Sequence, residues 1–354
     1  MAKIVHLPNS KKVEFFCGTG GVGKTTTAAA RAVFLTKLNK RVLLITIDPA
    51  KRLKQVLGIE NKEEGTIQPV SLSLFEEQSD LSFDALLMTP YSTLKRVAAE
   101  NNTSDKIDTN ILKTLTKPYG GMNEIMSIVE LQMQLKKNTY DVIILDTPPG
   151  KHFIDFLESS KKIQNFFDKT FVEIFQFLDK SFQTKSTKFF APKNLITNLV
   201  STGIKKLLSY LEDVTGESFV KEFIDSVSVL YLNRQTFLDA LQFHQQLKKV
   251  EFSNWFLVTS ADQHKIDEAI ELKKEAESFI HHDHFLIINK CLTQDFLDWS
   301  PEKSELQQLK DSLLHREKLL KEFSSKNFEN ILEFHEVLSP SPQVHVASLS
   351  KEFH

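Results

Sequence analysis

Residues 18–25 read Gly18-Thr19-Gly20-Gly21-Val22-Gly23-Lys24-Thr25, which is a complete phosphate-binding P-loop pattern. The pattern follows the apolar residues 13–17, typical of a strand, and leads into residues 26–32, typical of the first turns of a helix. Glycines let backbone N–H groups point at phosphate oxygens, and the helix N-terminus adds a partial positive charge. The pattern therefore predicts that Lys24 reaches the β- and γ-phosphates and that the Thr25 hydroxyl binds Mg²⁺.

The same glycines also fit the dinucleotide fingerprint Gly18-x-Gly20-x-x-Gly23, with Asp48 after the next strand as the acid that binds the ribose. This alternative describes a nicotinamide or flavin oxidoreductase, in which Lys24→Ala leaves cofactor binding nearly intact. Lys24 and Thr25 have phosphate and metal roles only in a P-loop, so we favour the P-loop. A glycine-rich turn without a ligand is a third interpretation, and the strand–loop–helix context argues against it.

Composition and charge narrow the class of protein. The chain has 354 residues and a formal net charge of −2, so no global basic field indicates nucleic-acid binding. Residues 1–12 lack an apolar core of signal-peptide length, and no uninterrupted apolar run reaches the roughly 18 residues of a membrane span. We therefore expect a cytoplasmic protein without stable membrane insertion. Cys17 and Cys291 lie in apolar contexts and form no CxxC pair, which favours small buried side chains.

Strands alternate with helices in the N-terminal half and again after residue 253, which predicts an α/β fold. The class expected is a P-loop NTPase with a mostly parallel sheet flanked by helices, plus a helical insertion. Strands are expected at 13–17, 41–47, 140–145, 255–259, 285–288 and 331–337. Helices are expected at 24–38, 83–100, 106–116, 122–135, 265–280 and 304–323, with residues 60–80 as loop.

The predicted organisation has three parts. Residues 1–158 form the first part of an ATPase core, residues 159–252 a Phe-rich helical insert, and residues 253–354 the second part of the core. The chain contains 28 Phe, a surplus that implies either a dry core or an apolar binding surface. Within the insert, one helix face repeats apolar side chains at helical spacing, and this stripe is either core or groove: Phe167, Phe171, Phe175, Leu178 and Phe182.

Two acids follow apolar strands and are candidates for catalysis. Asp146 closes the apolar residues 142–145, where a P-loop hydrolase places the second acid that holds Mg²⁺. Asp48 follows the strand at 41–47, at the strand end where ligands bind in open α/β sheets. We expect Asp48 to position the attacking water or to act as a general base. Alternatively, Asp48 only caps a short helix that begins near Ala50.

Together these motifs resemble the nucleotide motifs of the ArsA-type ATPases, a family of arsenite-pump ATPases and factors that target tail-anchored proteins. The similar segments are 18–26, Asp48-Pro49-Ala50, Gly121-Met122-Asn123-Glu124 and Asp146-Thr147-Pro148-Pro149-x-x-His152. The resemblance implies ATP and Mg²⁺ as cofactors, Asp48 and Lys24 as catalytic residues, and Thr25 and Asp146 as metal ligands. Implied ATP contacts are Gly18, Thr19, Gly20, Gly21, Val22, Gly23, Lys24, Thr25, Thr26, the adenine-contacting Asn289, and Pro340 in a loop that closes over the base.

The resemblance also implies a homodimer that closes on ATP and opens after hydrolysis. The ATP state would then control binding of an unknown protein or hydrophobic client through the helical insert. The alternative is a nearly inactive nucleotide-gated scaffold of the ParA or MinD kind. Residues 289–292 do not complete the guanine signature Asn-Lys-x-Asp, which favours ATP over GTP.

The sequence departs from the family pattern in three respects, and these limit which family properties can be expected of this chain. Thr19 stands where the family has a lysine that reaches the partner subunit's phosphates. Lys51, Arg52 and Lys151 are candidate replacement cations, or merely solvated charges. The two cysteines do not provide the thiolate cluster that arsenite binding needs, or the CxxC pairs of an intersubunit zinc site.

Overall fold

The computed structural model describes residues 9–47, 51–59, 64–76, 79–117, 122–158, 209–210, 212–297 and 299–353. They fall into two compact units, which we describe separately. The first unit takes its residues from Met1–Met88, Leu131–Leu157 and His244–His354, and the second from Thr89–Glu130 and Glu158–Phe243. Within the described ranges, no helix combines the length and the apolar character that crossing a membrane requires.

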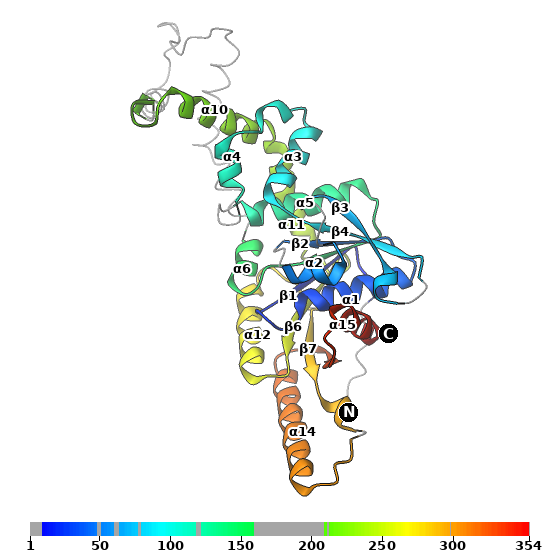
Figure 1. Cartoon of the computed structure of the whole chain (residues 1–354). Coiled ribbons are helices and arrows are strands. Elements are labelled where there is room, and N and C mark those ends of the chain that lie inside the picture. Colours follow the sequence, from blue (N-terminus) through cyan, green and yellow to red (C-terminus); the bar gives the residue numbers. More distant parts are fainter. Residues whose placement is uncertain are drawn as a thin grey trace, which may run out of the picture. The chain divides into compact units, whose positions relative to one another are not determined.

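An eight-stranded sheet forms the centre of the first unit, in the order β3-β4-β2-β5-β1-β6-β7-β8 (Figure 1). All neighbouring strands run parallel except the pair β3 and β4. The strands span Val13–Gly18 (β1), Val42–Thr46 (β2), Ile67–Ser71 (β3), Ser82–Leu87 (β4), Val142–Asp146 (β5), Ser253–Ser260 (β6), Phe285–Cys291 (β7) and Asn330–His335 (β8). Every residue of β1, β2 and β5 is buried, as expected for apolar strands that are covered on both faces.

The strand order determines which residues meet at the carboxyl edge of the sheet. β1 lies between β5 and β6, and Phe16 of β1 is the register partner of Asp146. The carboxyl ends of parallel strands lie at one edge, so the P-loop after β1 lies beside the end of β5. On its other side are the ends of β6, β7 and β8.

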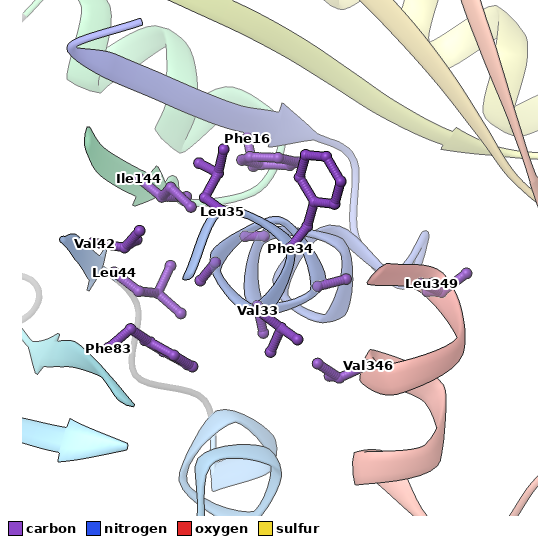
Figure 2. Close-up of a cluster of buried hydrophobic side chains, with 14 of the residues drawn as sticks. Phe16, Val33, Phe34, Leu35, Val42, Leu44, Phe83, Ile144, Val346 and Leu349 are labelled. Carbon is purple, nitrogen blue, oxygen red and sulfur yellow. The ribbon is translucent and has the colours of Figure 1, made fainter. Parts of the chain in front are cut away.

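Helices cover both faces of this sheet. Phe15 and Phe16 are adjacent on β1 and therefore point to opposite faces. Phe16 stacks on Phe256 at 4.7 Å, on the face where α1 (Lys24–Lys37) and α15 (Pro342–Ser350) complete one apolar cluster (Figure 2). Phe15 stacks on Trp255 at 3.9 Å, and Phe153 of α6 (Lys151–Leu157) meets that indole edge-on at 6.3 Å.

Two of the other described helices of the first unit are those that the sequence predicts. α12 and α14 correspond to the helices expected at 265–280 and 304–323, while α15 was not predicted. Their bounds, with those of the short helices, are α2 (Lys51–Leu57), α12 (Gln263–Ala276), α13 (Thr293–Leu297), α14 (Ser304–Ser325), η1 (Leu72–Leu74) and η3 (Lys351–Phe353).

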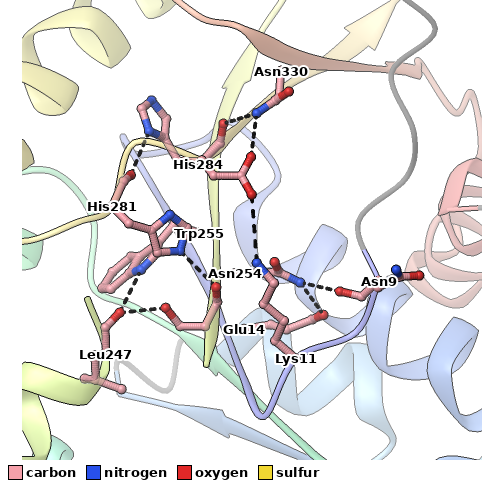
Figure 3. Close-up of polar contacts among 11 residues, drawn as sticks. Asn9, Lys11, Glu14, Leu247, Asn254, Trp255, His281, His284 and Asn330 are labelled. Atoms are coloured by element: carbon pink, nitrogen blue, oxygen red, sulfur yellow. Dashed lines mark hydrogen bonds and ion pairs between the residues drawn. The ribbon is translucent and has the colours of Figure 1, made fainter. Parts of the chain in front are cut away.

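A polar network joins the amino ends of the strands at the opposite edge of the sheet (Figure 3). His281 Nε2 lies 2.9 Å from Ser253 O at the start of β6. Asn254 Nδ2 donates to Glu14 Oε1 of β1 at 3.0 Å, and Asn330 Nδ2 at the start of β8 donates to Asp283 Oδ1 at 3.0 Å. These bonds give partners to polar groups of the buried residues Glu14, Asn254 and His281, while Asp283 and Asn330 are half-buried.

The second unit is helical. Its described elements are α3 (Pro90–Glu100), η2 (Ser104–Lys106), α4 (Asn110–Leu115), α10 (Glu217–Leu232), most of α11 (Arg234–Gln246) and the start of α5 (Asn123–Lys137). Asn233, which ends α10, accepts from Asn101 Nδ2 at 2.8 Å and donates to Thr103 Oγ1 at 2.9 Å. Thr109 and Ser226 hydroxyls lie 2.6 Å apart. These bonds group residues 89–130 with α10, whereas the sequence-based division assigned them to the core.

Two short strands differ from the sequence-based expectation. Residues 82–87 form β4 rather than the start of a helix, and α3 begins only at Pro90. A run of six residues is too short for hydrophobic periodicity to separate a strand from a helix. Residues 67–71 form β3 where a loop was expected. Pro69 and the exposed, polar side chains of β3 are tolerated because the strand lies at the sheet edge.

The Phe surplus is accounted for in part by the core of the first unit. Phe15, Phe16, Phe256, Phe334 and Phe353 are each at most 1% exposed. The predicted stripe from Phe167 to Phe182 lies outside the described residues. Cys17 and Cys291 are buried and free, as expected for small apolar side chains.

Candidate functional site

The P-loop connects the end of β1 at Gly18 to the start of α1 at Lys24. Gly23 precedes the helix with φ 93°, a left-handed conformation that a side chain disfavours. A Cβ atom at this position would lie 2.2 Å from Asn289 Nδ2. The Gly23 carbonyl accepts from the Thr27 backbone N–H and from Thr27 Oγ1, both at 2.9 Å. Only glycine fits this turn.

Thr25 and Asp146 meet beside the loop. Thr25 Oγ1 in the first turn of α1 donates to Asp146 Oδ2 at 2.7 Å. Thr46 Oγ1 at the end of β2 donates to the same oxygen at 3.2 Å. A hydroxyl and a carboxylate are the hard oxygen ligands that Mg²⁺ prefers, so this pair fits the predicted metal site.

Lys24 is buried at the start of α1, with 8% of its surface exposed. The neighbouring Cys17 thiol donates to Phe256 O at 3.4 Å. Burial raises the pKa of Cys17 to about 12, although the Lys24 ammonium group acts in the opposite direction. Cys17 therefore stays neutral and does not compete with a phosphate for the Lys24 charge.

Asn289 lies at the end of β7 and contacts the P-loop. Its Nδ2 donates to Val22 O at 2.9 Å, and 5% of the residue is exposed. The resemblance assigns Asn289 to the adenine. In the structure its amide also braces the phosphate loop, a role that sequence reasoning missed because the bond joins residues 267 positions apart.

A cavity of about 280 Å³ opens over these residues. Its lining comes from the P-loop and α1, from the ends of β5, β7 and β8, and from α15: Thr19, Gly20, Gly21, Gly23, Lys24, Thr25, Thr26, Asp146, Thr147, Pro149, Asn289, Lys290, His335, Glu336, Val337, His345 and Leu349.

Three predicted ATP contacts do not line the cavity. Gly18 is part of β1 and pairs with Val258, and the Val22 side chain is buried in the core. Pro340 is exposed, whereas Glu336 and Val337 of the same connection line the cavity. The role of Pro340 at the base stays a prediction.

Several predicted functional side chains fall outside the described part of the structure. Asp48 is not among the described residues, so its catalytic role stays a prediction. The same is true of the candidate cations Lys51, Arg52 and Lys151, whose side chains are not described.

A charged pair on α12 lies beside Thr19. Glu268 and Lys265 form an ion pair at 2.8 Å, and His264 Nε2 lies 3.2 Å from the same carboxylate. The hydrogen bond from Lys265 lowers the pKa of Glu268, and the Thr19 hydroxyl adds to this effect. The P-loop position at which the resemblance implies a lysine is thus close to the Glu268 carboxylate of α12.

The residues at the end of β8 and on α15 that line the cavity were not predicted from the sequence. His335 Nε2 lies 2.9 Å from Ser348 Oγ, and His345 Nε2 lies 2.6 Å from Ser339 O. These contacts hold α15 against the end of β8, which brings Leu349 to the cavity. No motif marks these residues, because only the packing of α15 on α1 brings them to the P-loop.

The first comparison with known proteins concerns a family. The ArsA_ATPase family model, described as "Anion-transporting ATPase", matches residues 11–332. The match includes the P-loop, Asp146 and Asn289.

Individual relatives agree with this match. "ATPase get3" of Aspergillus terreus is 25% identical over 280 residues, which cover 78% of this chain and 72% of the relative. "ATPase GET3" of Mycosarcoma maydis is 31% identical over 143 residues, 40% of each chain. "ATPase get3" of Schizosaccharomyces japonicus is 30% identical over 150 residues, 42% of this chain and 44% of the relative.

A P-loop at the centre of a mostly parallel sheet, with the Thr25–Asp146 pair beside it, has the architecture of a P-loop NTPase. The family match covers most of the chain, including both strand–helix halves of this sheet. The chain therefore belongs to the ArsA family of anion-transporting ATPases and is itself an ATPase.

Proposed function

We propose that the chain is a Mg²⁺-dependent ATPase that works as a dimeric switch, in which the ATP state controls binding of a protein or hydrophobic client. The observation that carries the catalytic part is the 2.7 Å contact between Thr25 Oγ1 and Asp146 Oδ2 at the cavity. It brings together the two proposed metal ligands, which lie 121 residues apart in the sequence, next to a complete P-loop.

Each residue has a distinct role in this proposal. The P-loop backbone and the start of α1 bind the phosphates, and Lys24 neutralises charge on the β- and γ-oxygens. Thr25 and Asp146 would hold Mg²⁺, which would neutralise charge that develops on the phosphates during transfer. Asp48 orients the attacking water.

The dimer and the client rest on the family resemblance and on the relatives named ATPase GET3. In this proposal the helical insert, residues 159–252, changes its exposed surface when the dimer closes, and the protein is cytoplasmic. The departure at Thr19 keeps the alternative open, a scaffold that binds ATP tightly with little turnover.

The metal role is tested by Mg²⁺-dependent ATP hydrolysis in Thr25→Ala and Thr25→Ser. We expect Thr25→Ala to lose at least about tenfold in turnover, because losing one oxygen ligand of Mg²⁺ should raise the barrier by more than ~1.4 kcal/mol. Thr25→Ser keeps the hydroxyl and should retain most activity. Equal rates in the two variants would contradict the metal role of Thr25.

The switch is tested by the hydrolysis rate per subunit as the protein concentration rises, with Lys24→Ala as the inactive control. A specific rate that climbs and then saturates supports catalysis by the dimer. A flat, Lys24-dependent rate, with a monomer by sizing at every concentration, excludes it. Tight ATP binding with turnover no higher than the control supports the scaffold instead.

A further inference from the structure

Lys290 has an unusual backbone conformation for a lysine. Its φ is 65°, in the left-handed region. The other non-glycine residues with positive φ in the described ranges are Asn39, Asn102 and Asn138. Asparagine tolerates this region because its short polar side chain bonds locally, whereas lysine gains no such compensation. A strained residue that persists in a strand is a candidate for function.

The strain arises from an extra residue in β7. Ile288 pairs with Glu333 and Cys291 with His335, so three steps along β7 match two steps along β8. Backbone bonds hold both sides of this irregularity, since Ala261 N–H donates to Asn289 O at 3.0 Å and Glu336 N–H donates to Cys291 O at 2.9 Å. A β-bulge of this kind redirects a side chain.

The redirected residue lines the nucleotide cavity. Lys290 is the one exposed residue of β7, whose other six residues are all buried. In a regular strand it would alternate with Asn289 and Cys291 across the faces of the sheet. The bulge instead brings Lys290 to the same cavity as Asn289 and the P-loop.

The strand order shows which residues lie at each end of the cavity. Asp146 and Thr25 lie at the ends of β5 and β1, on one side of the P-loop. Lys290 and Glu336 lie on the other side, at the ends of β7 and β8. A nucleotide with its metal-bound phosphates at β5 and β1 therefore has its base toward β7 and β8. At that end Val337 and Leu349 supply apolar lining.

We propose that Lys290 packs over the base of the bound nucleotide, with its aliphatic stem along the ring and its ammonium group over the ring face. This role rests on the proposed ATP-binding function of the same cavity. A cation is attracted to the face of an aromatic ring, and a lysine stem covers apolar surface while its charge stays in water. Lys290 is thus a base-contacting residue, separate from the groups that hold the phosphates.

The test compares Lys290→Gly and Lys290→Met with the wild type. Lys290→Gly removes the stem and the charge and relieves the backbone strain, whereas Lys290→Met keeps most of the stem. Asn39→Gly is the control, because Asn39 is exposed, has φ 58° and does not line the cavity. Dissociation constants are measured by calorimetry with Mg²⁺ for ATP, ADP and inorganic tripolyphosphate, which has no base. Thermal unfolding is recorded in parallel.

We expect Lys290→Gly to weaken ATP and ADP alike by about threefold to tenfold. Tripolyphosphate binding should be unchanged, and the melting temperature should rise because the strain is gone. Lys290→Met should fall between Lys290→Gly and the wild type, and Asn39→Gly should match the wild type in binding.

Two results overturn the base contact while leaving the proposed ATPase intact. One is unchanged ATP affinity in Lys290→Gly. The other is an equal loss for ATP and tripolyphosphate, which would place Lys290 on the phosphates. A wild type that binds neither ATP nor ADP would instead overturn the proposed function, and the base contact with it.

Discussion

The side-chain amide of Asn289 donates to the main-chain carbonyl of Val22 at 2.9 Å. One residue at the end of β7 thereby holds the middle of the phosphate loop after β1, across the intervening strand β6. The contact is close enough that Gly23, the next residue of the loop, has no room for a side chain. The shape of the P-loop is therefore determined from outside the loop as well as by its own glycines.

Gly23→Ala should weaken ATP binding by at least about tenfold, because strain from the left-handed φ adds to a clash with Asn289. Gly20→Ala is the matched control, since a Cβ at Gly20 meets no atom within 4 Å. Its loss should be much smaller. Titration calorimetry with ATP and Mg²⁺ measures both, and similar losses in the two variants would show that the Asn289 contact does not restrict the loop.

The buried ion pair of Glu14 and Arg31 should dominate the charge contribution to stability. Arg31 Nε and Nη2 donate to the two Glu14 oxygens at 2.9 and 3.0 Å, and Asn254 Nδ2 completes the network. Glu14→Gln leaves a buried guanidinium group without its counter-charge, so we expect a loss of about 3–5 kcal/mol in the free energy of unfolding.

Urea denaturation measures this loss. The control is Asp141→Asn, which breaks the exposed pair with Arg41. An exposed pair contributes little, so the control should remain close to wild type. Equal decreases in the free energy of unfolding of the two variants would contradict the expectation that the buried ion pair contributes more than the exposed one.

Stability should fall on acidification because of two histidines at the amino edge of the sheet. Burial lowers the pKa of both His281 and His284 below the ordinary value of 6.5. As the pH falls through 6.5, the unfolded chain binds protons that the folded chain resists. The free energy of unfolding therefore decreases below this pH and is fully retained above it. Lys11 and Lys273 reinforce the shifts, and the carboxylates of Asp283 and Glu329 oppose them.

The measurement is urea unfolding from pH 8 to pH 5. His281→Gln keeps a donor toward Ser253 O but does not titrate, so it should flatten the pH dependence. The exposed neighbour His282 provides the control, and His282→Gln should leave the slope unchanged. An unaltered slope in His281→Gln would exclude His281 as a source of acid sensitivity.

Both thiols should resist alkylation in the native protein. Burial raises the pKa of Cys17 and of Cys291 to about 12, so the reactive thiolate is scarce at neutral pH. Iodoacetamide at pH 8 should modify neither until denaturant is added, as mass spectrometry can follow. Rapid labelling of either cysteine under native conditions would contradict this account.

The central strands and the edge strand β8 were predictable from the sequence, whereas β3 and β4 at the other edge of the sheet were not. β1, β2 and β5 are continuous apolar runs because both their faces are covered, and a run of this kind is visible in the sequence. β3 and β4 pair only with each other and with β2, so their residues alternate or are polar and resemble loop or helix.

Some contacts of the candidate site could also be predicted from the sequence, and others could not. The contact between Thr25 and Asp146 could be expected from two local motifs. In P-loop hydrolases the acid that follows a neighbouring strand lies beside the P-loop at the same edge of the sheet. The bond from Asn289 to Val22, the bulge at Lys290 and the wall from α15 depend on how distant elements pack. No local pattern encodes such contacts.

The cavity that begins with the P-loop is closed by His345 and Leu349 of α15, nearly the whole length of the chain later. Synthesis on the ribosome proceeds from the N-terminus, so the phosphate loop emerges first and its wall last. During translation, β1 and α1 exist without the apolar cover that Val346 and Leu349 give them. A chain that stalls before α15 therefore has the phosphate loop and the Thr25–Asp146 pair but lacks the part of the cavity that His345 and Leu349 line.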